Sequence, residues 1–152
     1  MTHALNGAAI FDKTPSYSSS EVYHRIASFT PAGIYLYKQF TYTTDVLFPV
    51  TMFVFLALLC RYTSQHVGLS RPIQITLLCI PGTWFVSDML ENFIVFRLLQ
   101  ILPAKNEFLA ATLGYVTIIK FSLLLLSVSV PGLIKAFEKR FIGKFSSSGV
   151  RF

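Results

Sequence analysis

Residues 73–96 read IQITLLCIPGTWFVSDMLENFIVF, an apolar run in which only the second half carries charge. Two more apolar runs, residues 46–60 and 108–134, lie before and after it. The chain of 152 residues is 53% hydrophobic and 13% charged, whereas soluble domains carry about 25% charged residues. Since a membrane span needs about 20 apolar residues, the sequence predicts an all-α, integral membrane helical bundle with about three transmembrane helices.

We expect these helices to form a single membrane domain, residues 19–136, with proline residues marking points of bending. The predicted spans cover about residues 31–62, 72–102 and 108–136. Pro49 should bend the first span, because its ring removes one backbone donor and leaves the carbonyl of residue 45 without its helical partner. Pro81-Gly82 predicts an interior break in the second span, and Pro131-Gly132 lies near the end of the third.

The N-terminal part of the chain differs in composition from the spans. Residues 1–18 are predicted to be a flexible N-terminus, and Ser18 or Ser19 suits the cap of a short helix. An apolar stripe follows at helical spacing and consists of Val22, Tyr23, Ile26 and Phe29. This stripe fits an interfacial helix at the membrane surface, and it equally fits a surface helix that packs on the bundle.

Residues 137–152 form a basic amphipathic C-terminal tail. The basic side chains expected at the membrane surface are Lys135, Lys139, Arg140 and Lys144. Because they directly follow a span, membrane lipids of an anionic leaflet suit them better as partners than nucleic acid does. The positive-inside rule then places the C-terminus on the cytosolic side, or on the matrix or stromal side in an organelle.

Charge inside the spans is the clearest functional signal, because it costs roughly 2.5–3.5 kcal/mol per group at the centre of a membrane helix. Asp88, Glu91 and Asn92 occupy positions i, i+3 and i+4, so they share one helix face. Lys120 lies in the middle of the third span, and Asp45 opens the apolar part of the first. At about 1.5 Å per residue, all four charged groups can reach the outer half of a core about 30 Å thick.

This polar cluster has two main interpretations. Packed carboxylates resist joint ionisation, so the cluster could bind a proton, a cation or a lipid headgroup in a transport-related or lipid-related role. Glu91 or Asp88 would then be the titrating group, and Lys120 the counter-ion. Alternatively, an ion pair of Lys120 locks two helices in register and Asn92 adds an interhelical hydrogen bond, as in a structural or assembly subunit. A membrane-embedded enzyme acting on lipid is a third interpretation.

Other chemistries lack their residues in this sequence. All three histidines lie outside the predicted spans, which argues against a histidine zinc site and against haem. There is no G-x-S-x-G, no Gly-rich phosphate loop and no CxxC. We therefore predict no metal and no cofactor, and we favour a non-enzymatic protein whose helices offer faces for a homo- or hetero-oligomer. Cys60 and Cys79 are expected to be small apolar residues rather than a disulfide.

Three short motifs resemble those of a family of small uncharacterised polytopic membrane proteins. They are Asp45-Val-Leu-Phe-Pro49, Asp88-Met-Leu-Glu91-Asn92 and Ile119-Lys120-Phe121. The resemblance covers about residues 12–125 and rests on the D-x-L-F-P and D-x-x-E-N patterns. Because this family has no assigned activity, the resemblance implies only that its polar residues act as one unit: Asp45, Asp88, Glu91, Asn92 and Lys120.

Overall fold

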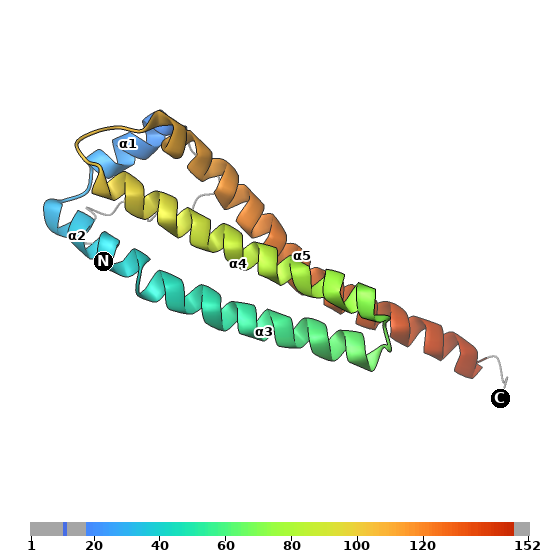
Figure 1. Cartoon of the computed structure of the whole chain (residues 1–152). Helices are drawn as coiled ribbons and strands as arrows, with labels where there is room; N and C mark the ends of the chain where they lie inside the picture. Colours follow the sequence, from blue (N-terminus) through green and yellow to red (C-terminus); the bar gives the residue numbers. More distant parts are fainter. Residues whose placement is uncertain (1–10, 12–17, 148–152) are drawn as a thin grey trace.

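The structure is a computed structural model that describes Phe11 and residues 18–147, with side chains up to Glu138. Apart from Phe11, these residues form helices and the turns between them, and they contain no strand (Figure 1). The helices are α1 (Ser19–Ala27), α2 (Pro31–Thr41), α3 (Thr44–His66), α4 (Arg71–Gln100) and α5 (Glu107–Ser147).

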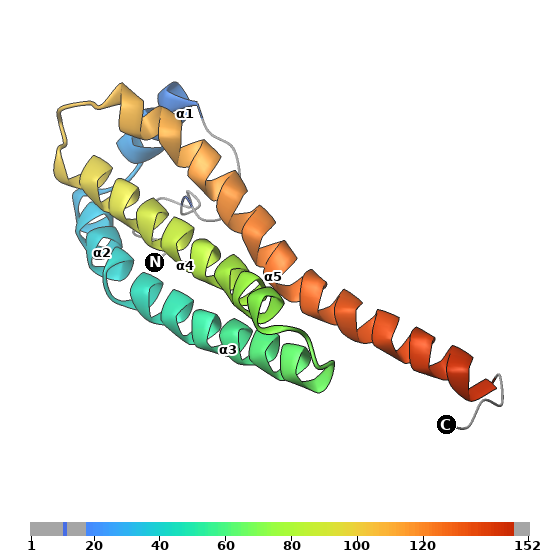
Figure 2. The ribbon, with the colours of Figure 1, turned by 45° about the vertical axis from the view of Figure 1, so that its right-hand side comes forward.

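Three helical stretches of the described chain are long and apolar enough to cross a membrane, which confirms the predicted fold class. They are Pro31–His66, Arg71–Gln100 and Glu107–Glu138. Figures 1 and 2 show α3, α4 and α5 packed along one another, with the two connections between them at opposite ends of the bundle. The short helices α1 and α2 lie at the end where α4 turns into α5.

The first of these stretches is interrupted at Tyr42–Thr43, between α2 and α3. Pro49, where we predicted a bend, lies inside α3, which continues as helix through this residue. At the interruption, Thr41 and Thr43 each donate to a carbonyl of the preceding turn, at 2.8 and 2.7 Å. Such bonds bend helices slightly, but Thr112 makes the same bond inside the uninterrupted α5, so they do not by themselves explain the interruption.

The Pro-Gly pairs do not break the other two helices. Pro81 lies inside α4 and Pro131 inside α5, and both are buried. Membrane helices tolerate proline where neighbouring helices and local adjustments satisfy the freed backbone groups. The predicted break at Pro81-Gly82 was therefore wrong.

α5 is the longest helix and carries the predicted basic tail. It continues without a break to Ser147, so residues 137–147 extend the third span as helix. Figures 1 and 2 show this part of α5 reaching past the turn between α3 and α4. Residues 148–152 of the predicted tail lie outside the described part of the chain.

Buried residues on the two longest helices recur at alternating intervals of three and four. On α4 they include Leu77, Pro81, Trp84, Asp88, Glu91, Val95 and Leu98. On α5 they include Ala110, Leu113, Thr117, Lys120, Ser127 and Pro131. A period of about 3.5 residues is typical of helices that pack nearly parallel or antiparallel along one face. Charged residues belong to both faces, so they lie within the packed interior of the bundle.

The apolar stripe of α1 packs on the bundle, as the second interpretation of this helix expects. It belongs to one aromatic core that includes Val22, Tyr23, Ile26, Phe29, Tyr37 and Phe11. The amide of Phe11 donates to the hydroxyl of Tyr37 at 2.9 Å, and the ring of Phe11 stacks on the Tyr37 ring. Apart from Phe11 and Ser18, the predicted flexible N-terminus, residues 1–18, lies outside the described residues.

Replacing Leu98 by alanine should lower the free energy of unfolding by about 2–5 kcal/mol, because the truncation leaves a cavity in the core. Leu98 on α4 is 0% exposed, whereas Leu90 on the same helix is 46% exposed. The matched control Leu90→Ala should therefore stay within about 0.5 kcal/mol of the parent. Reversible unfolding in mixed detergent micelles measures both values, and equal losses would contradict the assignment of the packed face of α4.

Candidate functional site

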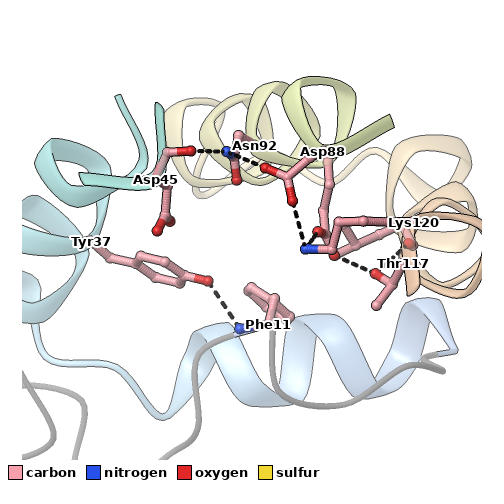
Figure 3. Close-up of polar contacts among 9 residues, drawn as sticks. Phe11, Tyr37, Asp45, Asp88, Asn92, Thr117 and Lys120 are labelled. Carbon is pink, nitrogen blue, oxygen red and sulfur yellow. Dashed lines mark hydrogen bonds and ion pairs between the residues drawn. The ribbon is translucent and has the colours of Figure 1, made fainter. Parts of the chain in front are cut away.

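A set of polar side chains meets inside the bundle, between α4 and α5 (Figure 3). Asp88 and Glu91 project from α4, and Lys120 faces them from α5. Their exposed fractions are 6%, 1% and 4%. The two acids lie on one face because they are three residues apart on a helix, so both reach the same neighbour.

The ammonium of Lys120 is shared by the two carboxyl groups. Its Nζ lies 3.2 Å from Oδ1 of Asp88 and forms a second ion pair with Oε2 of Glu91. A buried charge is tolerated when it is paired and hydrogen-bonded. The shared ammonium therefore joins the middle of α4 to the middle of α5.

Thr117 adds a hydroxyl to this contact. Its Oγ1 donates to Oε1 of Glu91, and it also lies 2.9 Å from the carbonyl oxygen of Leu113 on its own helix. Thr117 was not among the residues predicted from the sequence, because a threonine in an apolar run has no distinctive signal by itself. Its position three residues before Lys120 places both side chains on one face of α5, and this spacing was the available signal.

Asn92 connects the same site to α3. Its Nδ2 donates to the carbonyl oxygen of Asp45 at 2.7 Å and lies 3.5 Å from Oδ2 of Asp88. Pro49 explains why this carbonyl is available, since proline has no N–H to donate to the carbonyl four residues before it. Pro49 itself is fully buried. The side chain of one helix thus replaces the hydrogen bond that proline removes from another.

Asp45 joins the site through its main chain. In Figure 3 its carboxyl group points away from the Asn92 amide, toward the side on which Tyr37 lies. We expected four charged groups to meet in one layer. The structure brings Asp88, Glu91 and Lys120 together, whereas the contact from Asp45 to Asn92 is made by a backbone carbonyl.

These contacts form one connected unit, which we call the ion network and define as Asp88, Glu91, Asn92, Thr117 and Lys120. Through the Asp45 carbonyl it reaches α3, so it joins all three long helices. Buried polar groups in a membrane need internal partners, because lipid offers none. The network meets this requirement by linking helices to one another.

The predicted membrane-surface residues lie apart from the ion network. The Nζ of Lys135 lies 5.2 Å from the centre of the Tyr62 ring on α3, close enough for a cation–π contact. Lys139, Arg140 and Lys144 belong to the helical part of α5 whose side chains the structure does not describe. Their contact with an anionic leaflet stays a prediction.

The described residues contain no group of three or more His, Cys, Asp or Glu side chains arranged to hold a metal ion. Cys60 is buried, Cys79 is exposed, and both are free thiols. No family model, curated protein or solved structure matches this chain. The resemblance based on the D-x-L-F-P and D-x-x-E-N patterns therefore stays a prediction.

Asn92 donates to the Asp45 carbonyl, which lacks a helical donor because of Pro49. The effects of substituting Asn92 and Pro49 on the unfolding free energy should therefore be coupled. Asn92→Leu should cost about 0.6 kcal/mol of unfolding free energy and at most about 1.7 kcal/mol, the average and the maximum measured for interhelical hydrogen bonds in a membrane protein. The cost should fall in a Pro49→Ala background, because alanine restores an N–H for the Asp45 carbonyl. A double-mutant cycle measures the coupling. Equal costs in both backgrounds would contradict this explanation of the contact.

Thr117→Val should also destabilise the bundle by about 0.6–1.7 kcal/mol, because valine keeps the shape but loses the bond to Glu91 on the neighbouring helix. Thr112 offers a matched control on α5, since its hydroxyl donates to the Phe108 carbonyl of its own helix at 2.8 Å. Thr112→Val should leave the unfolding free energy nearly unchanged. A similar loss in both variants would show that the local bond to the helix, and not the contact with Glu91, carries the effect.

Proposed function

We propose that this chain is a small multi-pass membrane protein with a structural role, either on its own or as an assembly subunit, in which the ion network fixes how the spans pack. One observation carries the proposal. The single buried ammonium of Lys120 on α5 contacts two carboxyl groups of α4. Asn92, also on α4, donates a hydrogen bond to α3.

Charged side chains are costly inside a membrane, and this cost makes the faces of α4 and α5 unequal. Each ionised group at the centre of a span costs roughly 2.5–3.5 kcal/mol, so a helix that carries two acids is strongly penalised for facing lipid. Contact with Lys120 removes this penalty only when the correct faces of α4 and α5 meet. The network therefore favours one packed arrangement over arrangements in which a helix is rotated. Fixing the register between helices is the best-attested use of buried polar groups.

Burial supports a packing role over chemistry on a substrate. The three ionisable side chains of the network are between 1% and 6% exposed. Each of them contacts the opposite helix of the α4–α5 pair. A group that reacts with a ligand must be reached by it, whereas a group that orients helices needs only to reach its neighbour.

Removing the shared ammonium tests the proposal. Lys120→Met should lower the unfolding free energy by about 3–5 kcal/mol, because it leaves two buried carboxyl groups without this partner. Lys38→Met removes a positive charge from α2, outside the network, and should have little effect. Unfolding in detergent and abundance in the membrane measure the outcome. An unchanged stability of Lys120→Met would refute the packing role.

A charge-free triple variant separates structure from chemistry. Asp88→Leu, Glu91→Met and Lys120→Met together should recover most of the lost stability, since replacing a whole buried ion network by apolar residues of similar volume is often nearly neutral. If the role is structural, the triple variant complements a deletion strain. Stable protein that fails to complement would favour a titrating site instead.

One observation favours proton binding at Glu91 as a second candidate function. The Thr117 hydroxyl carries one proton but lies within hydrogen-bond distance of two acceptors, the Glu91 carboxyl and the Leu113 carbonyl. A protonated Glu91 would donate to this hydroxyl and allow it to donate to Leu113, so that both bonds form. The infrared band of a protonated carboxyl group, lost in Glu91→Gln and retained in Asp88→Asn, would support this candidate.

A further inference from the structure

A groove of about 480 Å³ opens between the end of α3 and the start of α4. It lies away from the ion network, since Leu78, the groove residue nearest to Asp88 along α4, is about 15 Å from it at the rise of an α-helix. Ligand sites commonly have volumes of about 300–1,000 Å³. The α3–α4 groove is therefore large enough to take a substantial part of a lipid.

The turn between α3 and α4 closes one end of the groove and is held in place by hydrogen bonds. Gly68 has a φ of 67°, and the amide of Leu69 donates to the carbonyl of Ser64 at 2.9 Å, an arrangement typical of a glycine helix end. The side chain of Gln74 also donates to the Leu69 carbonyl at 2.7 Å. These bonds hold the last turn of α3 against the first turn of α4.

Two arginines line the groove from opposite sides of this turn, Arg61 on α3 and Arg71 on α4. Both are exposed. Within the part of the chain that the structure describes, the ion pairs of Asp and Glu are made with Arg25 and Lys120, and neither groove arginine takes part. Since guanidinium groups bind phosphate through paired hydrogen bonds, this end of the groove has the charge and donors of an anion site.

The groove runs toward the interior of the spans, and its lining there is apolar, beyond the polar residues Ser64, Gln65 and Gln74. On α3, Leu58 and Val54 stand three and seven residues before Arg61, so all three share one helix face. On α4, Ile75 and Leu78 follow Arg71 in the same way. All four apolar side chains are between 44% and 60% exposed. They form an open apolar wall below the two charges.

We propose that the α3–α4 groove binds one anionic phospholipid. Arg61 and Arg71 hold the phosphate of its headgroup at the membrane surface, and an acyl chain lies on the apolar wall beneath them. Positive charge at one end and apolar surface at the other match the two parts of such a lipid. A soluble anion would use only the arginines, and a zwitterionic lipid would gain less from two cationic groups.

Native mass spectrometry of the full chain in nonionic detergent tests this site. Phosphatidylglycerol and phosphatidylcholine with identical acyl chains are titrated separately. The chain should retain one phosphatidylglycerol with roughly tenfold or greater preference. Arg61→Gln with Arg71→Gln should reduce this retention roughly tenfold or more, because charge-assisted hydrogen bonds are lost. The control Lys38→Gln with Arg97→Gln removes two charges elsewhere and should leave retention unchanged.

A second pair of variants tests the apolar wall. Leu58→Asn with Ile75→Asn keeps both arginines and should still weaken phosphatidylglycerol retention several-fold, because the acyl chain loses apolar contact. Equal retention of the two lipids, or full retention by the arginine variant, would overturn the proposal. Displacement of phosphatidylglycerol by an equal concentration of inorganic phosphate would also overturn it, in favour of a free anion site.

Discussion

The ammonium of Lys120, shared by Asp88 and Glu91, joins the middle of α4 to the middle of α5, and it is the contact by which we propose that the packing of this bundle is fixed. A helix has about 3.6 residues per turn, so a shift of one residue rotates its faces by about 100°. Such a rotation would turn the buried acids toward lipid, where each costs roughly 2.5–3.5 kcal/mol. Apolar side chains on the same face tolerate rotation far better, because lipid is as apolar as they are. The charges therefore select the faces, and the apolar residues fill the space around them.

The attachment of α3 follows from a second constraint, the missing amide of Pro49. Its absence leaves the Asp45 carbonyl without a helical donor, and a buried carbonyl in a membrane must find another. Asn92 supplies that donor from α4, immediately beside Glu91. The proline that weakens α3 locally thus creates the acceptor by which α3 binds its neighbour. One face of α4 consequently carries both the ion pairs to α5 and the hydrogen bond to α3.

Much of this arrangement could be predicted from the sequence, because it depends on spacing within single helices. The apolar runs predict the spans, the three- and four-residue spacing puts Asp88, Glu91 and Asn92 on one face, and the rise per residue brings Lys120 to a similar depth. The role of Thr117 and the burial of Phe11 were missed, since both depend on how separate helices are rotated and docked. The interruption at Tyr42–Thr43 was also missed, because no proline or glycine marks it in the sequence.

The buried charges also affect how the chain enters a membrane. α4 is the least apolar of the three candidate spans and carries two acids, which together cost about 5–7 kcal/mol on insertion scales. Lys120 lies 29 residues after Glu91 in the chain and is the fourteenth residue of α5, so its charge becomes available only once about the first third of that helix has been synthesised. α4 and α5 are joined by a short connection and lie against each other along the bundle. We therefore expect α4 and α5 to insert together as a helical hairpin. In this order of events α4 enters the lipid only after Lys120 has been synthesised.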